Sequence, residues 1–306
     1  MNRKNIFYIA LFGLSIALMS FIPKPNNGTK QKHSLRKIVI DAGHGGKDFG
    51  ATGKFSNEKD ISLAVSLKLQ ELLQDQMPDV EIYMTRTTDV FDNVKEKANK
   101  ANAAGGDLFV CIHCNSSEVY RKSISGYKTV TTKKHGKKHS QKVPIYSTVR
   151  VPSEVKGTET YIWGMSKNGS KAKALSENES LYMDSSLNNE MKDFDPNDPA
   201  KMVLYSLKTQ QYLDRSFNLA NTVEDEFVKS GRISRGAKQR NEKGIWVLQA
   251  VAMPAILVET GFISNTEEEN YLNSADGQTQ TAQCIVNAIK RYRYSLENKI
   301  SHSGGK

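Results

Sequence analysis

The sequence of 306 residues lacks most features that would place a protein outside the ordinary globular class. Its three cysteines cannot form a disulfide framework, and a chain of this length buries a core without such bridges. Disorder is excluded because 38% of the residues are hydrophobic. Collagen-like and heptad periods are absent, and only one apolar run is relevant to a membrane. These absences predict one large domain, or two small ones.

The apolar run lies at the N-terminus. Arg3 and Lys4 precede it, and it extends over residues 6–21 before a proline-containing polar stretch. A basic head followed by an apolar stretch predicts a signal peptide or a signal anchor over residues 1–25, rather than a buried first helix. The run is shorter than the roughly 20 residues of a comfortable membrane span, and no Ala-x-Ala motif follows it. We therefore expect export, with cleavage and anchoring both open.

The charge is strongly positive, with 43 Lys plus Arg against 33 Asp plus Glu and a net charge of +10. For an exported chain this favours anionic polymers outside the membrane as partners and argues against nucleic acid. The positive charge is concentrated between Arg121 and Lys142, where there are eight basic residues and no acidic one. Two interpretations of this stretch stay open: a solvated, mobile loop, which we favour, and a dedicated polyanion site.

Strand and helix patterns alternate from residue 35 onwards. They are a short apolar strand at 37–41, a helix that opens at Asn57, a strand at 80–86, a helix at 94–104 and a strand at 107–113. This alternation predicts an α/β fold, a single domain with a twisted, mostly parallel central sheet flanked by helices. We assign it to residues 35–296 and expect a disordered tail at 297–306.

Four polar residues lie where these strands end or where a helix begins. They are His44 in the glycine-rich loop after the first strand, Glu58 in the first helical turn, His113 at the end of the third strand, and Glu259 after a late apolar strand at 254–258. Ligands of open α/β sheets bind at the carboxyl edge of the strands, so we expect these four at one edge. Taken singly, each has a plainer explanation, such as a hydrogen-bonded strand end or a favourable helix dipole.

Two imidazoles and a carboxylate form a ligand set for a catalytic zinc ion, which keeps a fourth position for water. Zinc lowers the pKa of a bound water to about 7 and polarises a carbonyl, while a second carboxylate can accept the proton. Glu259 suits that second role. The four residues therefore favour metal-assisted hydrolysis.

The cysteines offer a competing ligand set, because Cys111 and Cys114 lie close to His113. We reject it, since a closed thiolate site would need a fourth ligand and Cys284 lies alone in a predicted helix. Cys111 and Cys284 are expected to be small buried hydrophobes. An exposed, oxidation-sensitive Cys114 is a weaker alternative.

The stretches around the four residues are 39–46, 57–58, 112–116 and 257–265. In order, they resemble the motifs of the zinc-dependent N-acetylmuramoyl-L-alanine amidases of the AmiC type, amidase type 3. The resemblance covers roughly residues 35–294. It implies that His44, Glu58 and His113 are the zinc ligands and that Glu259 is the catalytic carboxylate.

The reaction that the resemblance implies is hydrolysis of the amide between N-acetylmuramic acid and L-alanine of the stem peptide. It also implies a peptidoglycan hydrolase of cell-wall remodelling or daughter-cell separation, in the periplasm, either free or tethered by an uncleaved N-terminus. Two alternatives stay open. Another exported zinc peptidase would need a basic residue for a terminal carboxylate, and an inactive wall-binding protein would be expected to have lost one of the four residues.

A few positions depart from the family's pattern. Val94 and Lys97 stand where leucine and arginine are usual, and Gln249 stands where a basic residue is common. We expect these departures to affect substrate contacts or packing more than the chemistry. Asp41, just before the glycine-rich loop, either orients a metal ligand or stabilises the loop.

Two stretches are long for a compact α/β domain, the basic one at 118–156 and one within 165–207. Related cell-division amidases carry, in the second position, a helix that blocks the zinc site until a partner protein displaces it. The resemblance thus implies that residues 173–207 are regulatory, that Glu177 or Glu179 occupies the metal's open position, and that an activator protein exists. The alternative is a surface helix without that role.

Overall fold

The computed structural model describes residues 35–134, 137–178 and 199–302, so the predicted signal segment lies outside the described residues. One compact unit spans Leu35–Leu296. A second unit combines Met1–Ser34 with Glu297–Lys306, and only the end of a helix is described there. Within the described ranges, every helix is too short or too polar to cross a membrane.

A six-stranded sheet forms the centre of the unit Leu35–Leu296, in the order β2-β1-β3-β8-β6-β7. Its strands are β1 (Lys37–Ala42), β2 (Glu81–Met84), β3 (Leu108–Asn115), β6 (Thr158–Ile162), β7 (Ser234–Gln239) and β8 (Ala255–Phe262). All neighbouring pairs are parallel except β6 with β8. The predicted mostly parallel α/β sheet is confirmed.

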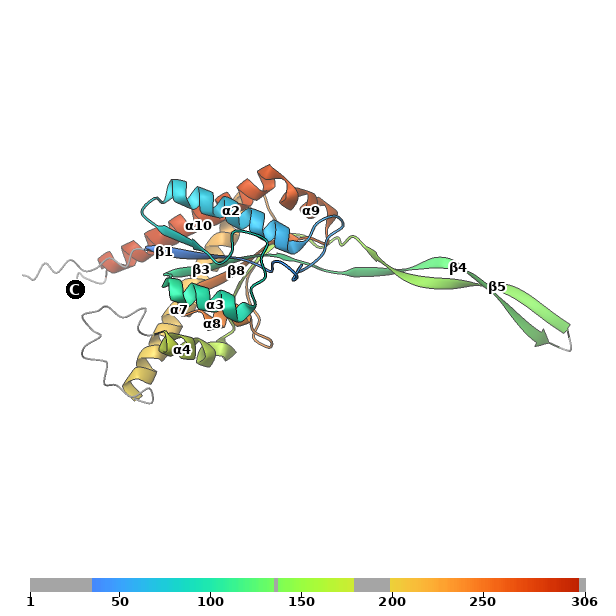
Figure 1. Cartoon of the computed structure of the whole chain (residues 1–306), viewed down its shortest axis with the longest axis horizontal. Coiled ribbons are helices and arrows are strands. Elements are labelled where there is room, and N and C mark those ends of the chain that lie inside the picture. The colour runs from blue at the N-terminus through green and yellow to red at the C-terminus, as the bar shows by residue number, and fades with distance from the viewer. Residues whose placement is uncertain (1–34, 135–136, 179–198, 303–306) are drawn as a thin grey trace, which may run out of the picture. The chain divides into compact units, whose positions relative to one another are not determined.

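Helices cover both faces of this sheet, with α2 and α10 on one side and α3 and α8 on the other (Figure 1). The helical elements are α2 (Glu58–Gln76), α3 (Val94–Ala104), η1 (Met165–Lys167), α4 (Asn168–Glu177), α7 (Pro199–Lys229), α8 (Trp246–Ala250), α9 (Thr266–Asn273) and α10 (Ala275–His302). Residues 297–302 of the predicted tail at 297–306 are helical, which corrects that part of the prediction, and residues 303–306 lie outside the described residues. No glycine or proline interrupts the sequence of α10 after its first turn until Gly304.

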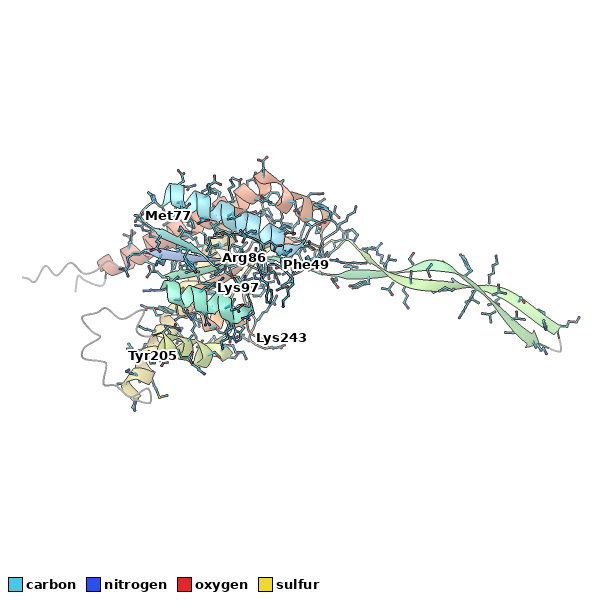
Figure 2. The ribbon with its side chains drawn as sticks, in the orientation of Figure 1. Phe49, Met77, Arg86, Lys97, Tyr205 and Lys243 are labelled. Atoms are coloured by element: carbon cyan, nitrogen blue, oxygen red, sulfur yellow. The ribbon has the colours of Figure 1, made fainter. Side chains whose placement is uncertain are left out.

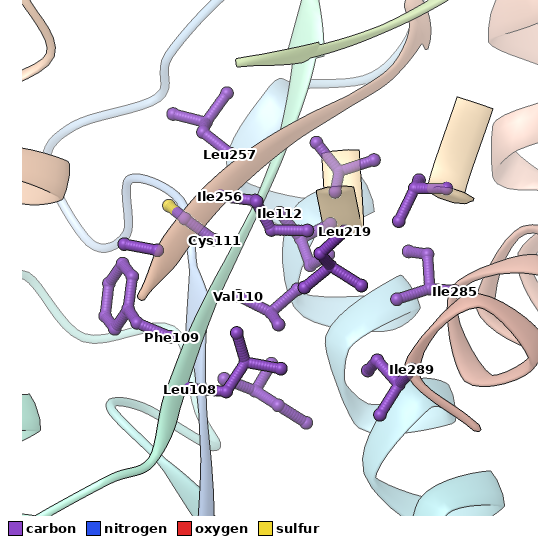
Figure 3. Packing of buried hydrophobic residues seen from close by; sticks show 14 of the residues in the cluster. Leu108, Phe109, Val110, Cys111, Ile112, Leu219, Ile256, Leu257, Ile285 and Ile289 are labelled. Carbon is purple, nitrogen blue, oxygen red and sulfur yellow. The ribbon is translucent and has the colours of Figure 1, made fainter. Parts of the chain in front are cut away.

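Strand β3 explains how the sheet is buried and where its polar end lies. Leu108, Val110 and Ile112 point towards Leu219 of α7 and towards α10, while Phe109 and Cys111 point to the opposite side (Figure 3). All five β3 residues are fully buried. A strand covered on both faces needs apolar side chains at every position, so the first polar side chain, His113, marks its carboxyl end.

The basic stretch forms a β-hairpin, which corrects the predicted mobile loop. Strands β4 (Val119–Lys134) and β5 (Lys137–Val151) pair antiparallel in a sheet of their own (Figure 1). The physical reason lies in the composition of the stretch, which is rich in valine, threonine, tyrosine and isoleucine as well as lysine. Such residues favour strands, and lysine in an unpaired edge strand discourages unwanted pairing.

Candidate active site

The loop between β1 and α2 brings two imidazoles close together. His44 has a left-handed backbone with φ of 56°, which is uncommon for a residue with a side chain. A Cβ atom on Gly43 would lie 2.6 Å from the His113 ring, and one on Gly50 would lie 2.6 Å from His44 and Glu58. The glycines therefore leave room that larger residues would fill.

A buried ion pair and a buried arginine hold the start of this loop. Figure 2 labels the two basic residues, Lys97 and Arg86. Lys97 Nζ lies 2.9 Å from Asp41 Oδ1, and Thr85 and Cys111 also donate to Asp41. Burial would raise the pKa of Asp41, but Lys97 and these donors lower it overall. Of the two roles left open for Asp41, the structure shows loop stabilisation, because these contacts do not involve a site histidine.

Arg86 fixes the loop against the helix that follows it. Its Nη2 donates to the carbonyl oxygens of Gly43 at 2.7 Å and Lys59 at 2.9 Å, and its Nε donates to Ala42. One guanidinium thus joins the end of β1 to the first turn of α2. Lys97, which stands where arginine is usual, donates to the same Ala42 carbonyl.

Glu58 lies between the two histidines, at the start of α2. Its Oε1 is 2.7 Å from His113 Nδ1, and its Oε2 is 3.1 Å from His44 Nε2. The amides of Ala51 and Cys114 also donate to this carboxylate. Burial opposes ionisation, but the hydrogen bonds with His113 and His44 hold the pKa of Glu58 well below its usual range. The carboxylate is therefore charged at neutral pH.

His44, Glu58 and His113 form a group whose ligand atoms all lie within 4.8 Å of one another. Zinc binds imidazole nitrogen and carboxylate oxygen at roughly 2.0–2.2 Å, so ligands of one tetrahedral ion lie a few ångströms apart. The donor set and its spacing fit a zinc ion. The structure thus brings together the three residues that the sequence predicted as ligands.

Asp48 is a partner of His44 that sequence reasoning missed. Its Oδ2 lies 2.9 Å from His44 Nδ1, on the side of the ring away from Glu58. Burial would lower the pKa of His44, but the bonds to Glu58 and Asp48 raise it overall. A carboxylate on the second ring nitrogen fixes the tautomer of a metal-binding histidine. The sequence does offer one signal for this contact, because Asp48 follows His44 by four residues within a short loop.

Replacing Asp48 with asparagine should weaken zinc binding by about 10- to 100-fold, because the amide no longer favours the proton on His44 Nδ1. Competition with a chromogenic zinc chelator measures this change. Asp75→Asn, at an exposed position of α2, is the matched control and should bind zinc like the parent chain. Equal zinc affinity of the two variants would contradict the role of Asp48.

Glu259 lies on β8 opposite His113 of β3, so the two side chains are neighbours on one face of the sheet. It is only 8% exposed. Within the described part of the chain, its Oε2 atom has no hydrogen-bond partner. Burial raises its pKa to about 7, against a smaller opposite effect of His113. A carboxylate poised near neutral pH beside the histidine and glutamate group is suited to accept and return a proton.

The metal-free chain should lose stability between about pH 5 and pH 8 because of Glu259. Its pKa rises from 4.5 to about 7 on folding, so the folded state binds this proton more tightly than the unfolded state. The free energy of unfolding therefore falls as the pH increases through this window, by about 3 kcal/mol from this group. Glu259→Gln should remove that part of the dependence.

Denaturant unfolding with a metal chelator at both pH values measures the effect. The same pH dependence in the parent chain and in Glu259→Gln would show that Glu259 is not the responsible group.

Glu159 extends this row of side chains on the other side of Glu259. The two residues are partners in the antiparallel pairing of β6 with β8. Arg235 Nε and Lys238 Nζ each lie 2.6 Å from Glu159 Oε1. Both basic side chains are partly exposed, so β7 presents positive charge next to Glu159. Sequence reasoning missed these residues, because their common carboxylate lies far away in the chain.

The remaining predicted residues lie elsewhere. Glu177 is exposed at the end of α4, where its Oε1 lies 3.6 Å from Lys173 Nζ, and it is not part of the histidine and glutamate group. Glu179 lies outside the described residues. Cys114 is 3% exposed, so the alternative of an exposed thiol is wrong. The backbone amide of Cys114 donates a hydrogen bond to Glu58 Oε1. Burial raises the pKa of the Cys114 thiol well above its usual value.

The sequence model of a family described as N-acetylmuramoyl-L-alanine amidase matches residues 38–291. The chain belongs to this amidase family. The match confirms the resemblance found in the sequence and the predicted enzyme class, a hydrolase of amide bonds. It does not favour the alternative of a zinc peptidase.

Two relatives and one solved structure illustrate the similarity. AmiC of Escherichia coli O6:H1 is 29% identical over 272 residues, which are 88% of this chain and 55% of AmiC, so the chain spans about half of that relative. AmiA of Salmonella typhimurium is 25% identical over 317 residues, 99% of this chain and 95% of AmiA. The N-acetylmuramoyl-L-alanine amidase from Clostridium difficile 630 has a TM-score of 0.53 and 25% identity, covering 85% of this chain and 97% of that one.

Proposed function

We propose that the chain is a zinc-dependent amidase that cleaves the bond between N-acetylmuramic acid and L-alanine in peptidoglycan. The observation that carries this proposal is the position of Glu259, a buried carboxylate directly beside the group of His44, Glu58 and His113. Family membership supports the choice of bond. In the cell the enzyme would act in wall remodelling or daughter-cell separation.

The metal would be held by His44 through Nε2, by His113 through Nδ1 and by Glu58, since these atoms face one another. When bound, zinc supplies a Lewis acid that polarises an amide carbonyl and acidifies water. Asp48 keeps the His44 ring in the orientation that presents Nε2. Arg86 donates to the carbonyl oxygen of Gly43, and this contact keeps His44 in position relative to Glu58 and His113.

Glu259 provides the proton transfers. In its ionised form it accepts a proton from the attacking water, and it then delivers that proton to the nitrogen of the departing L-alanine. Both steps need a carboxyl group whose pKa is close to the working pH, and burial raises the pKa of Glu259 to about 7. Arg235 and Lys238 pair with Glu159, and among the described residues Glu259 Oε2 has no hydrogen-bond partner.

Export to the periplasm is part of the proposal. It is supported by the basic head and apolar run within residues 1–25, and the uncleaved form of that segment would tether the enzyme to the inner membrane. Both ideas are tested by fractionating cells and determining the N-terminal residue of the mature chain.

We also propose that residues 173–207 restrain the enzyme and that an activator protein relieves the restraint. The support is a pair of carboxylates, Glu177 at the end of α4 and Glu179 in the long stretch of sequence that precedes α7. Excising residues 177–202 should raise basal hydrolysis of purified peptidoglycan, because it removes the carboxylates proposed to fill the metal's open position. The double variant Glu177→Gln, Glu179→Gln is the companion that keeps the chain length.

Circular dichroism confirms that each variant is folded before its rate is compared. An unchanged basal rate in folded variants would leave the segment as a surface element without a regulatory role.

A further inference from the structure

The two faces of the β4–β5 hairpin differ in chemistry. The register pairs Tyr120 with Arg150, Lys122 with Thr148 and Ile124 with Tyr146 on one face. A bulge follows, because Gly126 is paired with Ile145, so one extra residue is inserted into β4. Residues of the regular strand β5 alternate between faces, which places Tyr127 and Pro144 on the same face as Tyr146.

The bulge therefore collects all three hairpin tyrosines on one side, which we call the tyrosine face. It carries the exposed aromatic rings Tyr120, Tyr127 and Tyr146, which are 55%, 62% and 59% exposed. Its basic residues are Lys122, Lys133, Lys138, Lys142 and Arg150. The opposite face carries the exposed aliphatic residues Val130, Ile145 and Val149. It also carries the exposed basic residues Arg121, Lys128 and Lys137, so the two faces differ in their aromatic rings and share the positive charge.

The tyrosine face begins next to the proposed metal site. Arg150, at its base, donates through Nη2 to the carbonyl oxygen of Thr52. Thr52 follows Ala51, whose amide donates to Glu58 Oε2. Strand β4 begins at Val119, shortly after the end of β3, the strand that carries His113. The face thus starts at the loops that hold the metal ligands.

An isolated two-stranded ribbon is marginally stable in water. Exposed aromatic rings gathered on one face are typical of a surface that binds another molecule. Charge selects the class of partner, since no acidic residue lies between Arg121 and Lys142. A polymer with both sugar rings and carboxylates is complementary, because sugar rings pack flat on tyrosines and carboxylates pair with lysine and arginine.

We propose that the tyrosine face binds the glycan strand and stem-peptide carboxylates of peptidoglycan and leads them to the metal site. This proposal rests on the proposed function for its substrate class. The hairpin would thus select polymeric wall material over short soluble fragments, by adding contacts along the chain that a single muramyl peptide is too short to make.

The test compares two triple variants of the full chain, each in the Glu259→Gln background so that bound wall material is not digested. One carries Tyr120→Ser, Tyr127→Ser and Tyr146→Ser. The matched control carries Val130→Ser, Ile145→Ser and Val149→Ser on the opposite face. Co-sedimentation with insoluble peptidoglycan should show about tenfold weaker binding, or more, for the tyrosine variant and little change for the control.

Binding is measured without turnover, so it is independent of whether the chain hydrolyses the wall. Equal binding by all chains, or equal losses in both triple variants, would overturn the proposal. Binding to vesicles of anionic lipid in place of peptidoglycan would also overturn it. With Glu259 restored, the tyrosine variant should hydrolyse insoluble peptidoglycan more slowly than the triple variant of the opposite face does.

Discussion

Replacing Glu259 with glutamine should abolish hydrolysis of peptidoglycan while leaving zinc bound. Glutamine has nearly the same shape, but it can neither accept the proton of water nor return one to the leaving nitrogen. General acid–base groups contribute about 10²- to 10⁴-fold to rates, and Glu259 is proposed to act in both steps, so we expect a loss in the upper part of that range. Release of soluble products measures the rate, and elemental analysis of the dialysed protein measures zinc.

Glu71→Gln is the matched control, because Glu71 lies exposed on α2 and pairs only with Lys68 among its described contacts. It should retain the parent rate. Hydrolysis by Glu259→Gln at the parent rate would refute the assigned role of Glu259. If the variant had also lost zinc, Glu259 would be needed for metal binding.

Replacing His113 with alanine should remove both zinc binding and hydrolysis. His113 supplies one of three predicted protein ligands, and Glu58 would lose the partner that lies 2.7 Å from its Oε1. The loss of one ligand from a three-residue site leaves too few donors for a catalytic zinc ion. Chelator competition and the rate of product release should therefore fall together, in contrast to the separation expected for Glu259→Gln.

His139→Ala controls for the removal of an imidazole, because His139 lies exposed on β5. It should bind zinc and hydrolyse peptidoglycan like the parent chain. Stoichiometric zinc binding by folded His113→Ala would show that the metal is held by other residues.

The position of the site was predictable because it follows from the ends of buried strands. A continuously apolar strand such as β3 must be covered on both faces, and its first polar residue then lies at the sheet's carboxyl edge. Two strands of this kind, β3 and β8, are parallel neighbours, which places His113 beside Glu259. No single segment of the sequence predicts the order of the strands. All parallel strands nevertheless end at the same carboxyl edge of the sheet, so the position of the site does not depend on that order.

The contacts that support the site were harder to predict, because they join residues far apart in the sequence. Arg86 donates to the carbonyl oxygen of Gly43, which lies more than forty residues earlier in the chain. Glu159 of β6 accepts hydrogen bonds from Arg235 and Lys238 of β7, a strand much later in the sequence. Neither charge pattern nor periodicity identifies such partners. The hairpin was missed for another reason: its lysines suggested a solvated loop, although its valines, threonines and tyrosines favour strands.

The most direct test of the account is the chemical identity of the products released from purified peptidoglycan. The full chain and its Glu259→Gln variant are incubated with zinc, beside the chain that lacks residues 177–202, and the soluble products are identified by mass spectrometry. The account predicts free stem peptides with a new L-alanine amino terminus, absent with Glu259→Gln and most abundant after the excision. Shortened peptides still attached to muramic acid would contradict it and indicate a peptidase instead.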